Sequence, residues 1–166
     1  GFGNVGKRVA EISNALGMKV SIYSSYFNSV KDNFKNYFSS DLTNILSNSD
    51  IISFHCKPNK DGSSIITKDE FNMMKKNCIL VNTARGGLIN ETDLIQALKN
   101  NIIKGAALDV FKKEPLEESE LFNLENIILT PHIAASTDEA QIVVAEMVAN
   151  QFCEYFKNNN IVNSIT

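Results

Sequence analysis

Short apolar runs alternate along the chain with segments whose apolar residues recur at helical spacing. The apolar runs predict strands at Lys19–Tyr23, Ile51–His55, Ile79–Asn82, Ala106–Val110 and Ile127–Thr130, with a weaker one at Asn36–Phe38. These runs are apolar at successive positions, which is typical of strands covered on both faces in a parallel sheet.

Helical patterns fill the intervals between these runs. The first predicted helix is Val5–Leu16, which carries an apolar face of Val5, Val9, Ile12 and Leu16 and ends at Gly17. A capping box, Thr67 to Glu70, opens a short helix through Met74. Asn90 caps a helix at Glu91–Lys99 whose Leu94, Ile95 and Leu98 point inward.

The last predicted helix opens at a second capping box, Ser136 to Glu139, and runs to about Lys157. It carries one apolar stripe of Ile142, Ala145, Val148 and Phe152. Strands that alternate with helices in this way predict the α/β class, with a Rossmann-like, doubly wound parallel sheet.

Composition narrows the class of protein without naming a function. The 166 residues are 43% hydrophobic and 21% charged, with a net charge of −3, as in an ordinary globular domain. No apolar run approaches the roughly 18 residues of a membrane helix, and no basic cluster predicts nucleic acid binding. Cys56, Cys78 and Cys153 are too few and too scattered for a disulfide framework or a zinc site. We therefore expect a cytoplasmic protein without a metal, membrane or nucleic-acid partner.

The chain opens with a glycine motif, Gly1-Phe-Gly3-Asn-Val-Gly6, which matches G-x-G-x-x-G and precedes a helix and a strand. Gly1 permits a tight turn, Gly3 lets backbone amides approach a pyrophosphate, and Gly6 lets the helix pack closely on a strand. The N-terminus of the helix then faces the negative charge. This context predicts a dinucleotide site rather than a plain glycine turn.

An acidic residue about 20 positions after such a motif usually binds the adenosine ribose hydroxyls. This chain has Ser24 there, followed by Ser25, and the nearest cation that follows is Lys31. A serine hydroxyl can bind a ribose hydroxyl or lie near a 2′-phosphate. The motif therefore leaves open the choice between NAD and NADP.

Four more blocks follow at wide spacing: Asn82-Thr-Ala-Arg85-Gly-Gly, Ala106-Ala-Leu-Asp109-Val-Phe, Glu114-Pro115 and Leu129-Thr-Pro-His132-Ile-Ala. With the glycine motif, their order and spacing resemble the D-2-hydroxyacid dehydrogenase family over nearly the whole chain. The segment from His132 to Gln141 is most similar to the branch that acts on D-3-phosphoglycerate. The resemblance implies hydride transfer between NAD and a D-2-hydroxy acid.

The resemblance also implies roles for four residues. Arg85 binds the substrate carboxylate and carbonyl oxygen, and His132 is the general acid/base for the hydroxyl proton. Glu114 pairs with His132, and Asp109 contacts the nicotinamide side of the cofactor. The residue chemistry agrees, because an arginine fork matches a carboxylate and histidine titrates near neutrality.

A larger set of residues is expected to line the cofactor. It comprises Gly1, Gly3, Asn4, Val5, Gly6, Ser24, His55, Cys56, Thr83, Ala84, Arg85, Asp109, His132, Ala134 and Ala135. Cys56 and Cys78 are expected to fill the core rather than act as nucleophiles. The loop after His55 departs from the family, since its proline comes three places later, at Pro58, instead of two.

A Rossmann sheet has a strand immediately before the glycine motif, and this sequence begins at Gly1. We therefore expect residues 1–160 to be a dinucleotide-binding domain that lacks its first central strand. Residues 161–166 are expected to begin the return to a substrate domain. The family also implies a homodimer or a higher homo-oligomer.

Two alternatives stay open beside the D-3-phosphoglycerate reading. One is a glyoxylate or hydroxypyruvate reductase of the same family. The other, from a different class, is an NADH-sensing binding protein like the corepressors that share this fold. Such corepressors retain the residues equivalent to Arg85, Glu114 and His132, so these residues do not exclude the second alternative.

Overall fold

The computed structural model describes residues 1–163. Its helices are α1 (Asn4–Ala15), α2 (Ser25–Val30), α3 (Leu42–Asn48), α4 (Lys68–Met73), α5 (Glu91–Lys99) and α6 (Asp138–Asn158), with 3₁₀ helices η1 (Lys31–Asn33) and η2 (Glu120–Asn123). Its strands are β1 (Val20–Ile22), β2 (Tyr37–Ser39), β3 (Ile51–Phe54), β4 (Ile79–Asn82), β5 (Gly105–Leu108) and β6 (Ile127–Leu129). The chain forms two compact units, Gly1–Pro131 and the segment that begins at His132.

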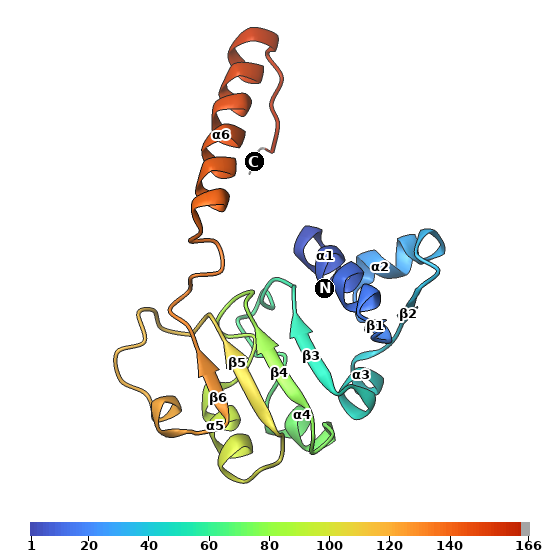
Figure 1. Ribbon diagram of the computed structural model, residues 1–166, viewed down its shortest axis with the longest axis vertical. Helices are drawn as coiled ribbons and strands as arrows, with labels where there is room; N and C mark the ends of the chain where they lie inside the picture. The colour runs from blue at the N-terminus through green and yellow to red at the C-terminus, as the bar shows by residue number, and fades with distance from the viewer. Residues whose placement is uncertain (164–166) are drawn as a thin grey trace. The chain divides into compact units, whose positions relative to one another are not determined.

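All strand pairs in the first unit are parallel, which confirms the predicted α/β class (Figure 1). Four strands form one sheet in the order β3-β4-β5-β6, and β1 pairs with β2 in a separate sheet. Within the described chain, β1 and β3 therefore each have a hydrogen-bonded neighbour on one side. The six predicted strands exist, and their observed bounds differ from the predicted ones by at most two residues.

The larger core lies between the four-stranded sheet and helices α3, α4 and α5. Leu46, Phe71 and Leu94, one from each helix, are almost completely buried in a cluster that includes Leu80 of β4. Inward Leu94 and Leu98 confirm the predicted face of α5, and Ile95 packs at the margin of the cluster. Complete burial of these side chains makes this cluster the main source of stability in the unit.

A smaller, aromatic core joins α1 to the two-stranded sheet. Phe2 contacts Phe27 edge to face, with ring centroids 4.8 Å apart, and Phe34 in the same way at 5.1 Å. Ala10 and Ile22 complete the buried part of this cluster. The residue between the first two glycines of the motif thus anchors the glycine turn in a hydrophobic cluster.

Helix α1 buries its small residues, Gly6 and Ala10. The predicted apolar face is largely exposed, from 36% at Val9 to 76% at Leu16. Gly6 packs so closely that an added Cβ would lie 2.6 Å from the Gly1 carbonyl oxygen. Close backbone approach on the small-residue side therefore sets the orientation of this helix.

Helices α2 and α3 lie between Ser21 and Ser49, a stretch rich in serine and asparagine where the hydrophobic pattern predicted no helix. Side-chain caps begin both helices: Ser24 Oγ accepts from Phe27 N, and Asp41 Oδ1 accepts from Asn44 N. Each helix is short and contributes one fully buried residue, Phe27 or Leu46. A few buried side chains and a cap were too weak a pattern to predict from periodicity.

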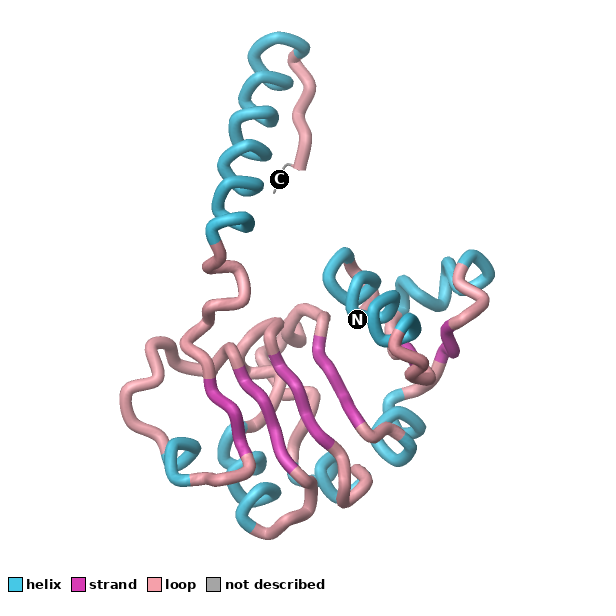
Figure 2. The backbone as a smooth tube through the Cα atoms, in the orientation of Figure 1, coloured by secondary structure: helices cyan, strands magenta, loops and turns pink. Residues whose placement is uncertain are grey.

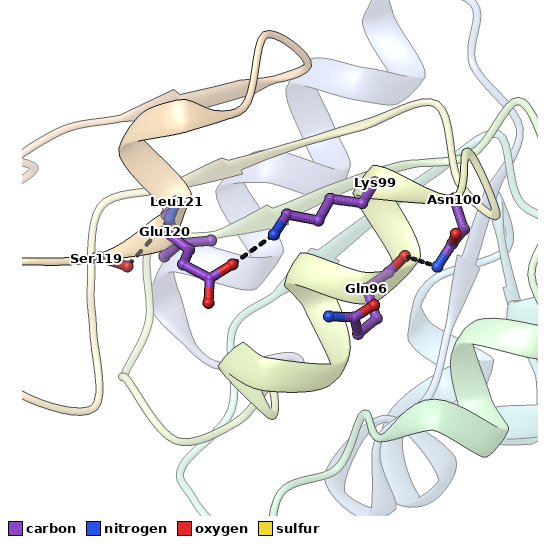
Figure 3. A network of polar contacts seen from close by, with 6 residues as sticks. All are labelled: Gln96, Lys99, Asn100, Ser119, Glu120 and Leu121. Carbon is purple, nitrogen blue, oxygen red and sulfur yellow. Dashed lines mark hydrogen bonds and ion pairs between the residues drawn. The ribbon is translucent and has the colours of Figure 1, made fainter.

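The predicted capping box at Thr67 is confirmed, because Glu70 Oε2 accepts from both Thr67 N and Thr67 Oγ1 at 2.9 and 2.6 Å. At the other end of the helix layer, an ion pair between Lys99 and Glu120 ties α5 to η2 (Figure 3). Asn100 Nδ2 donates to Gln96 O at 2.8 Å beside that pair. These contacts secure the end of α5 that lies opposite its capped N-terminus.

The second unit consists mainly of the long helix α6. The predicted capping residue Ser136 is wrong by one position: Thr137 is the N-cap, and its Oγ1 accepts from Ala140 N at 3.2 Å. The helix ends at Asn159, which has a left-handed conformation with φ of 50°. Asparagine tolerates this conformation and so can end a helix in place of glycine.

Candidate functional site

The carboxyl ends of the four parallel strands lie at one edge of the sheet, and the loops that carry most of the predicted site residues leave from it (Figure 2). His55 and Cys56 follow β3, Thr83 to Arg85 follow β4, and Asp109 follows β5. This edge is where open α/β sheets bind their ligands. The structure thus places these predicted residues at one edge from three separate parts of the sequence.

Gly1 lies between the ends of β1 and β3. Its amine donates to Tyr23 O at 2.9 Å, and an added Cβ would lie 2.3 Å from the carbonyl oxygen of His55. Only glycine fits this contact, so Gly1 packs between the end of β1 and the end of β3, which belong to different sheets.

Gly3 differs from Gly1 and Gly6 because a Cβ added there would meet no described atom within 4 Å. Internal packing therefore does not require glycine at this position. Gly3 is the N-cap of α1, where it makes no side-chain cap, and the first turn of the helix carries no acidic residue. An open N-terminus with Asn4, Val5 and Gly6 in its first turn fits an external anion such as a pyrophosphate.

Ser24 follows β1 and uses its Oγ as the cap of α2, with Phe27 N at 3.3 Å. A hydroxyl that accepts this bond still has a proton to donate, for example to a ribose oxygen. Lys7, which sequence reasoning passed over, lies with its Nζ 5.2 Å from the Tyr26 ring centroid. The turn after β1 thus carries a serine and a nearby cation on α1.

His55 and Cys56 are half-buried at the end of β3. His55 Nε2 lies 3.0 Å from Ser53 Oγ. Burial lowers the pKa of His55 from its ordinary value, which favours the neutral ring. A neutral, partly covered ring fits the wall of a cofactor site better than it fits general acid chemistry.

Arg85 projects from a tight turn after β4, and its side chain is exposed. Asn82 shapes this turn: its Nδ2 donates to Arg85 O at 2.9 Å and its Oδ1 accepts from Ala84 N at 3.1 Å. Gly86 then passes so close to the next loop that an added Cβ would lie 1.8 Å from Phe111 O. Sequence reasoning quoted Asn82 but assigned it no role, although a polar residue that ends an apolar run was the available signal.

Asp109 is buried at the end of β5, with 4% of its surface exposed. Its Oδ1 accepts from Thr130 Oγ1 at 2.6 Å, and its N donates to Asn82 O at 2.9 Å. Thr130 follows β6, so Asp109 links the ends of three neighbouring strands, to β6 through its carboxylate and to β4 through its backbone N–H. A buried carboxylate held in this way is a fixed acceptor at the ligand-binding edge.

Glu114 lies in the loop after β5, next to Pro115, with which it forms a cis peptide bond. Its Oε1 accepts from Phe111 N at 2.9 Å, which folds the loop back on itself. Glu91, at the start of α5, accepts from Lys112 N at 2.6 Å. The exposed Glu114 is therefore part of an ordered loop rather than of a solvated run of charges.

The predicted catalytic set is divided between the two units. Arg85 and Glu114 belong to the first, and His132 is the first residue of the second, with a left-handed φ of 54°. Ala134 and Ala135 follow it, and Ala135 O accepts from Gln141 Nε2 at 3.0 Å, which ties the segment to α6. The pairing of Glu114 with His132 stays a prediction.

The cysteines and hollows elsewhere point to no second centre. Cys78 is fully buried, and burial raises the pKa of its thiol to about 11, which fits the predicted core role. A shallow hollow lined by residues 32–37 lies before β2, away from the strand ends. Among residues 1–163 no His, Cys, Asp and Glu cluster could hold a metal ion, and no helix is long and apolar enough to cross a membrane.

The parallel sheet, the glycine turn and the polar residues at the strand ends define a Rossmann-like dinucleotide-binding domain. Comparison with known proteins gives the family. Residues 1–134 match the D-isomer specific 2-hydroxyacid dehydrogenase, NAD binding domain, so the chain belongs to this family of NAD-binding domains. The match confirms NAD as the family's cofactor, as the sequence predicted.

Individual relatives agree on the family and differ in their substrates. The chain is 38% identical to the glyoxylate reductase of Thermococcus litoralis, over 98% of the chain and 50% of that protein. It is 37% identical to the D-3-phosphoglycerate dehydrogenase of Methanocaldococcus jannaschii, over 98% of the chain and 32% of that protein. The chain thus spans half or less of these curated relatives.

A solved structure shows the same fold. An acyclic imino acid reductase, Bsp5, in complex with NADPH and D-Arg, superposes with a TM-score of 0.87 at 35% identity. The match covers 100% of this chain and 52% of that one. The described arrangement of strands and helices is therefore that of a known dehydrogenase-type domain.

Proposed function

We propose that the whole protein is an NAD-dependent oxidoreductase that acts on a D-2-hydroxy acid, with D-3-phosphoglycerate as its substrate. The carrying observation is the joined pair of loops after β4 and β5, which presents Arg85 and Glu114 at the sheet edge where the glycine turn also ends. The block from His132 to Gln141 supports the choice of substrate, as does the relatedness to D-3-phosphoglycerate dehydrogenases.

Each residue has a distinct part in the proposed reaction. The exposed guanidinium of Arg85 binds the substrate carboxylate and orients the carbon to be oxidised. His132 accepts the hydroxyl proton, and Glu114 stabilises the imidazolium that results. NAD, when bound, supplies the hydride acceptor. In the proposed site, that cofactor is held by the residues of the glycine turn together with Ser24, His55, Cys56, Thr83, Ala84, Asp109, Ala134 and Ala135.

The proposal extends to the organisation of the whole protein. Residues 1–160 form the cofactor domain, and a strand that precedes Gly1 would fit between β1 and β3, each of which pairs on one side within the described chain. Residues 161–166 begin the return to a substrate domain, and positions 164–166 lie outside the described residues. We further propose a cytoplasmic homodimer, which light scattering on the purified protein can test.

A second candidate substrate class is glyoxylate or hydroxypyruvate, because a glyoxylate reductase and a hydroxypyruvate reductase are among the relatives. The test compares initial rates of the whole protein on D-3-phosphoglycerate, glyoxylate and hydroxypyruvate, followed by nicotinamide absorbance. We expect the highest kcat/KM on D-3-phosphoglycerate and a loss of about 10²–10⁴-fold in His132→Gln. Faster turnover of the smaller acids would favour the reductase, and NADH binding without any turnover would favour a sensing protein.

A further inference from the structure

The loops that carry Arg85 and Glu114 are built as one unit, and two side chains outside the predicted catalytic set join them. Asn82 ends β4 and is 2% exposed. Its side chain closes the Arg85 turn through Arg85 O and Ala84 N. Its backbone oxygen accepts from Asp109 N at 2.9 Å. One residue therefore fixes the Arg85 turn through its side chain and the end of β5 through its backbone carbonyl.

The position of Asn82 in the sheet argues against a space-filling role. Its partners in register are Phe54 on β3 and Leu108 on β5, and both are buried and apolar. Burying an amide in such surroundings costs free energy unless all its hydrogen bonds are made. A side chain that only filled this position would be apolar like its neighbours. The amide instead makes its hydrogen bonds to the turn that presents Arg85.

Glu91, the first residue of α5, makes the second contact, which holds the loop after β5. Its Oε1 accepts from Lys112 N at 2.6 Å, three residues after Asp109 and two before Glu114. Its neighbour Asp93 makes the same kind of bond to a different place, with Oδ2 accepting from Lys68 N at 3.0 Å at the start of α4. One turn of α5 thus carries two carboxylates of equal chemistry, of which only Glu91 reaches the loop of Glu114.

We propose that Asn82 and Glu91 are positioning residues: Asn82 sets the guanidinium of Arg85 against the substrate carboxylate, and Glu91 sets the carboxylate of Glu114. The inference rests on the proposed function, because it assigns Arg85 to substrate binding and Glu114 to the proton-transfer pair. It divides the effects, since losing Asn82 affects substrate affinity and losing Glu91 affects the pH dependence of turnover.

The test uses the whole protein with Asn82→Leu, Asn82→Ala, Glu91→Ala and Glu91→Gln. Leucine keeps a branched side chain that suits the apolar neighbours, so a folding failure of Asn82→Ala leaves a second variant to measure. For the Asn82 variants we expect the KM for the hydroxy acid to rise about tenfold to 10²-fold and the KM for NAD to rise less, since small misplacements of a binding group cost this much. Glu91→Ala is expected to shift the pH profile of kcat/KM, and Glu91→Gln, which keeps the acceptor oxygen, to restore it.

Asp93→Ala is the matched control, because it removes an equivalent carboxylate-to-amide bond from the same helical turn. We expect it to lower the melting temperature at most and to leave KM and the pH profile unchanged. If the Asn82 and Glu91 variants behave like Asp93→Ala in an active protein, the inference is overturned while the proposed function stands. If the unsubstituted protein turns over no 2-hydroxy or 2-oxo acid, the proposed function itself fails and the inference fails with it.

Discussion

The two halves of the candidate site are held in different ways. The loops after β4 and β5 meet where Asp109 N donates to Asn82 O, and side-chain bonds from Asn82 and Glu91 each fix one of the two loops, above a single large core. The glycine turn lies between two sheets that do not pair, and it is anchored by Phe2 in a smaller aromatic cluster. The half proposed to bind substrate is therefore preorganised by polar contacts, and the cofactor half by close backbone packing at glycines.

The comparison separates two uses of glycine. Gly1, Gly6 and Gly86 are required because another part of the chain occupies the space of a side chain. Gly3 is required by nothing in the described chain, which leaves its space to a ligand. Substitutions at Gly1, Gly6 or Gly86 are therefore expected to change the stability of the fold, and a substitution at Gly3 is expected to change the affinity for the cofactor.

The largest expected effect comes from Gly86→Ala. The added methyl would lie 1.8 Å from Phe111 O, so the Arg85 turn and the following loop must move apart. We expect a destabilisation of about 1–3 kcal/mol from overpacking. We also expect a loss of about 10²-fold in kcat/KM from misplacement of Arg85. Thermal denaturation and steady-state rates measure the two effects, and a variant with normal stability and rates would show that the two loops are not coupled.

Gly3→Ala tests the other use of glycine. We expect the melting temperature to stay within a degree or so, because the methyl meets no described atom. We expect the dissociation constant for NADH to rise at least about tenfold, equivalent to about 1.4 kcal/mol of binding free energy. Calorimetric titration measures this change. A stability loss with normal affinity would contradict the assignment of this position to the cofactor.

Ser24→Asp tests whether Ser24 lies near the adenosine ribose of the cofactor. Aspartate preserves the cap of α2, but its charge opposes a 2′-phosphate. We expect the ratio of kcat/KM for NAD over NADP to rise by about tenfold. Ser24→Asn, a neutral cap, is the control and should leave the ratio unchanged. An equal ratio in both variants would place the ribose away from Ser24.

The smallest effect concerns His55. Its pKa is lowered in the folded protein, chiefly by burial, so the unfolded chain binds a proton more readily. Stability is therefore fully present above the ordinary pKa of 6.5 and falls as the pH drops from there toward the folded pKa. Melting temperatures of the natural protein and His55→Gln, measured between about pH 5.5 and 7, test this dependence. Parallel curves for the two would contradict it.

The sequence predicted the alternating strands and the capped helices of this fold, but it did not predict the short helices α2 and α3 or the packing of α1. Successive apolar residues located all six strands within one or two positions, and capping residues located α4 and α5. Periodicity missed α2 and α3 because their burial depends on single residues such as Phe27. It also missed that α1 packs through Gly6 and Ala10, since a small-residue contact leaves no hydrophobic signature.

The candidate site shows the same division. Motif spacing predicted which residues lie at the strand ends, and the strand order places them there. The roles of Asn82, Glu91 and Thr130 depend on hydrogen-bond partners 2 to 21 residues away, and a residue type does not reveal such partners. His132, which was the most distinctive residue in the sequence, belongs to a separate unit from Arg85.

The unpaired sides of β1 and β3 have a consequence for handling this polypeptide. Exposed strand edges with open N–H and C=O groups act as templates for another chain. Ile51 of β3 is about half exposed and adds apolar surface on that strand. A polypeptide of these 166 residues is expected to associate edge to edge as its concentration rises, which light scattering at a series of concentrations would measure.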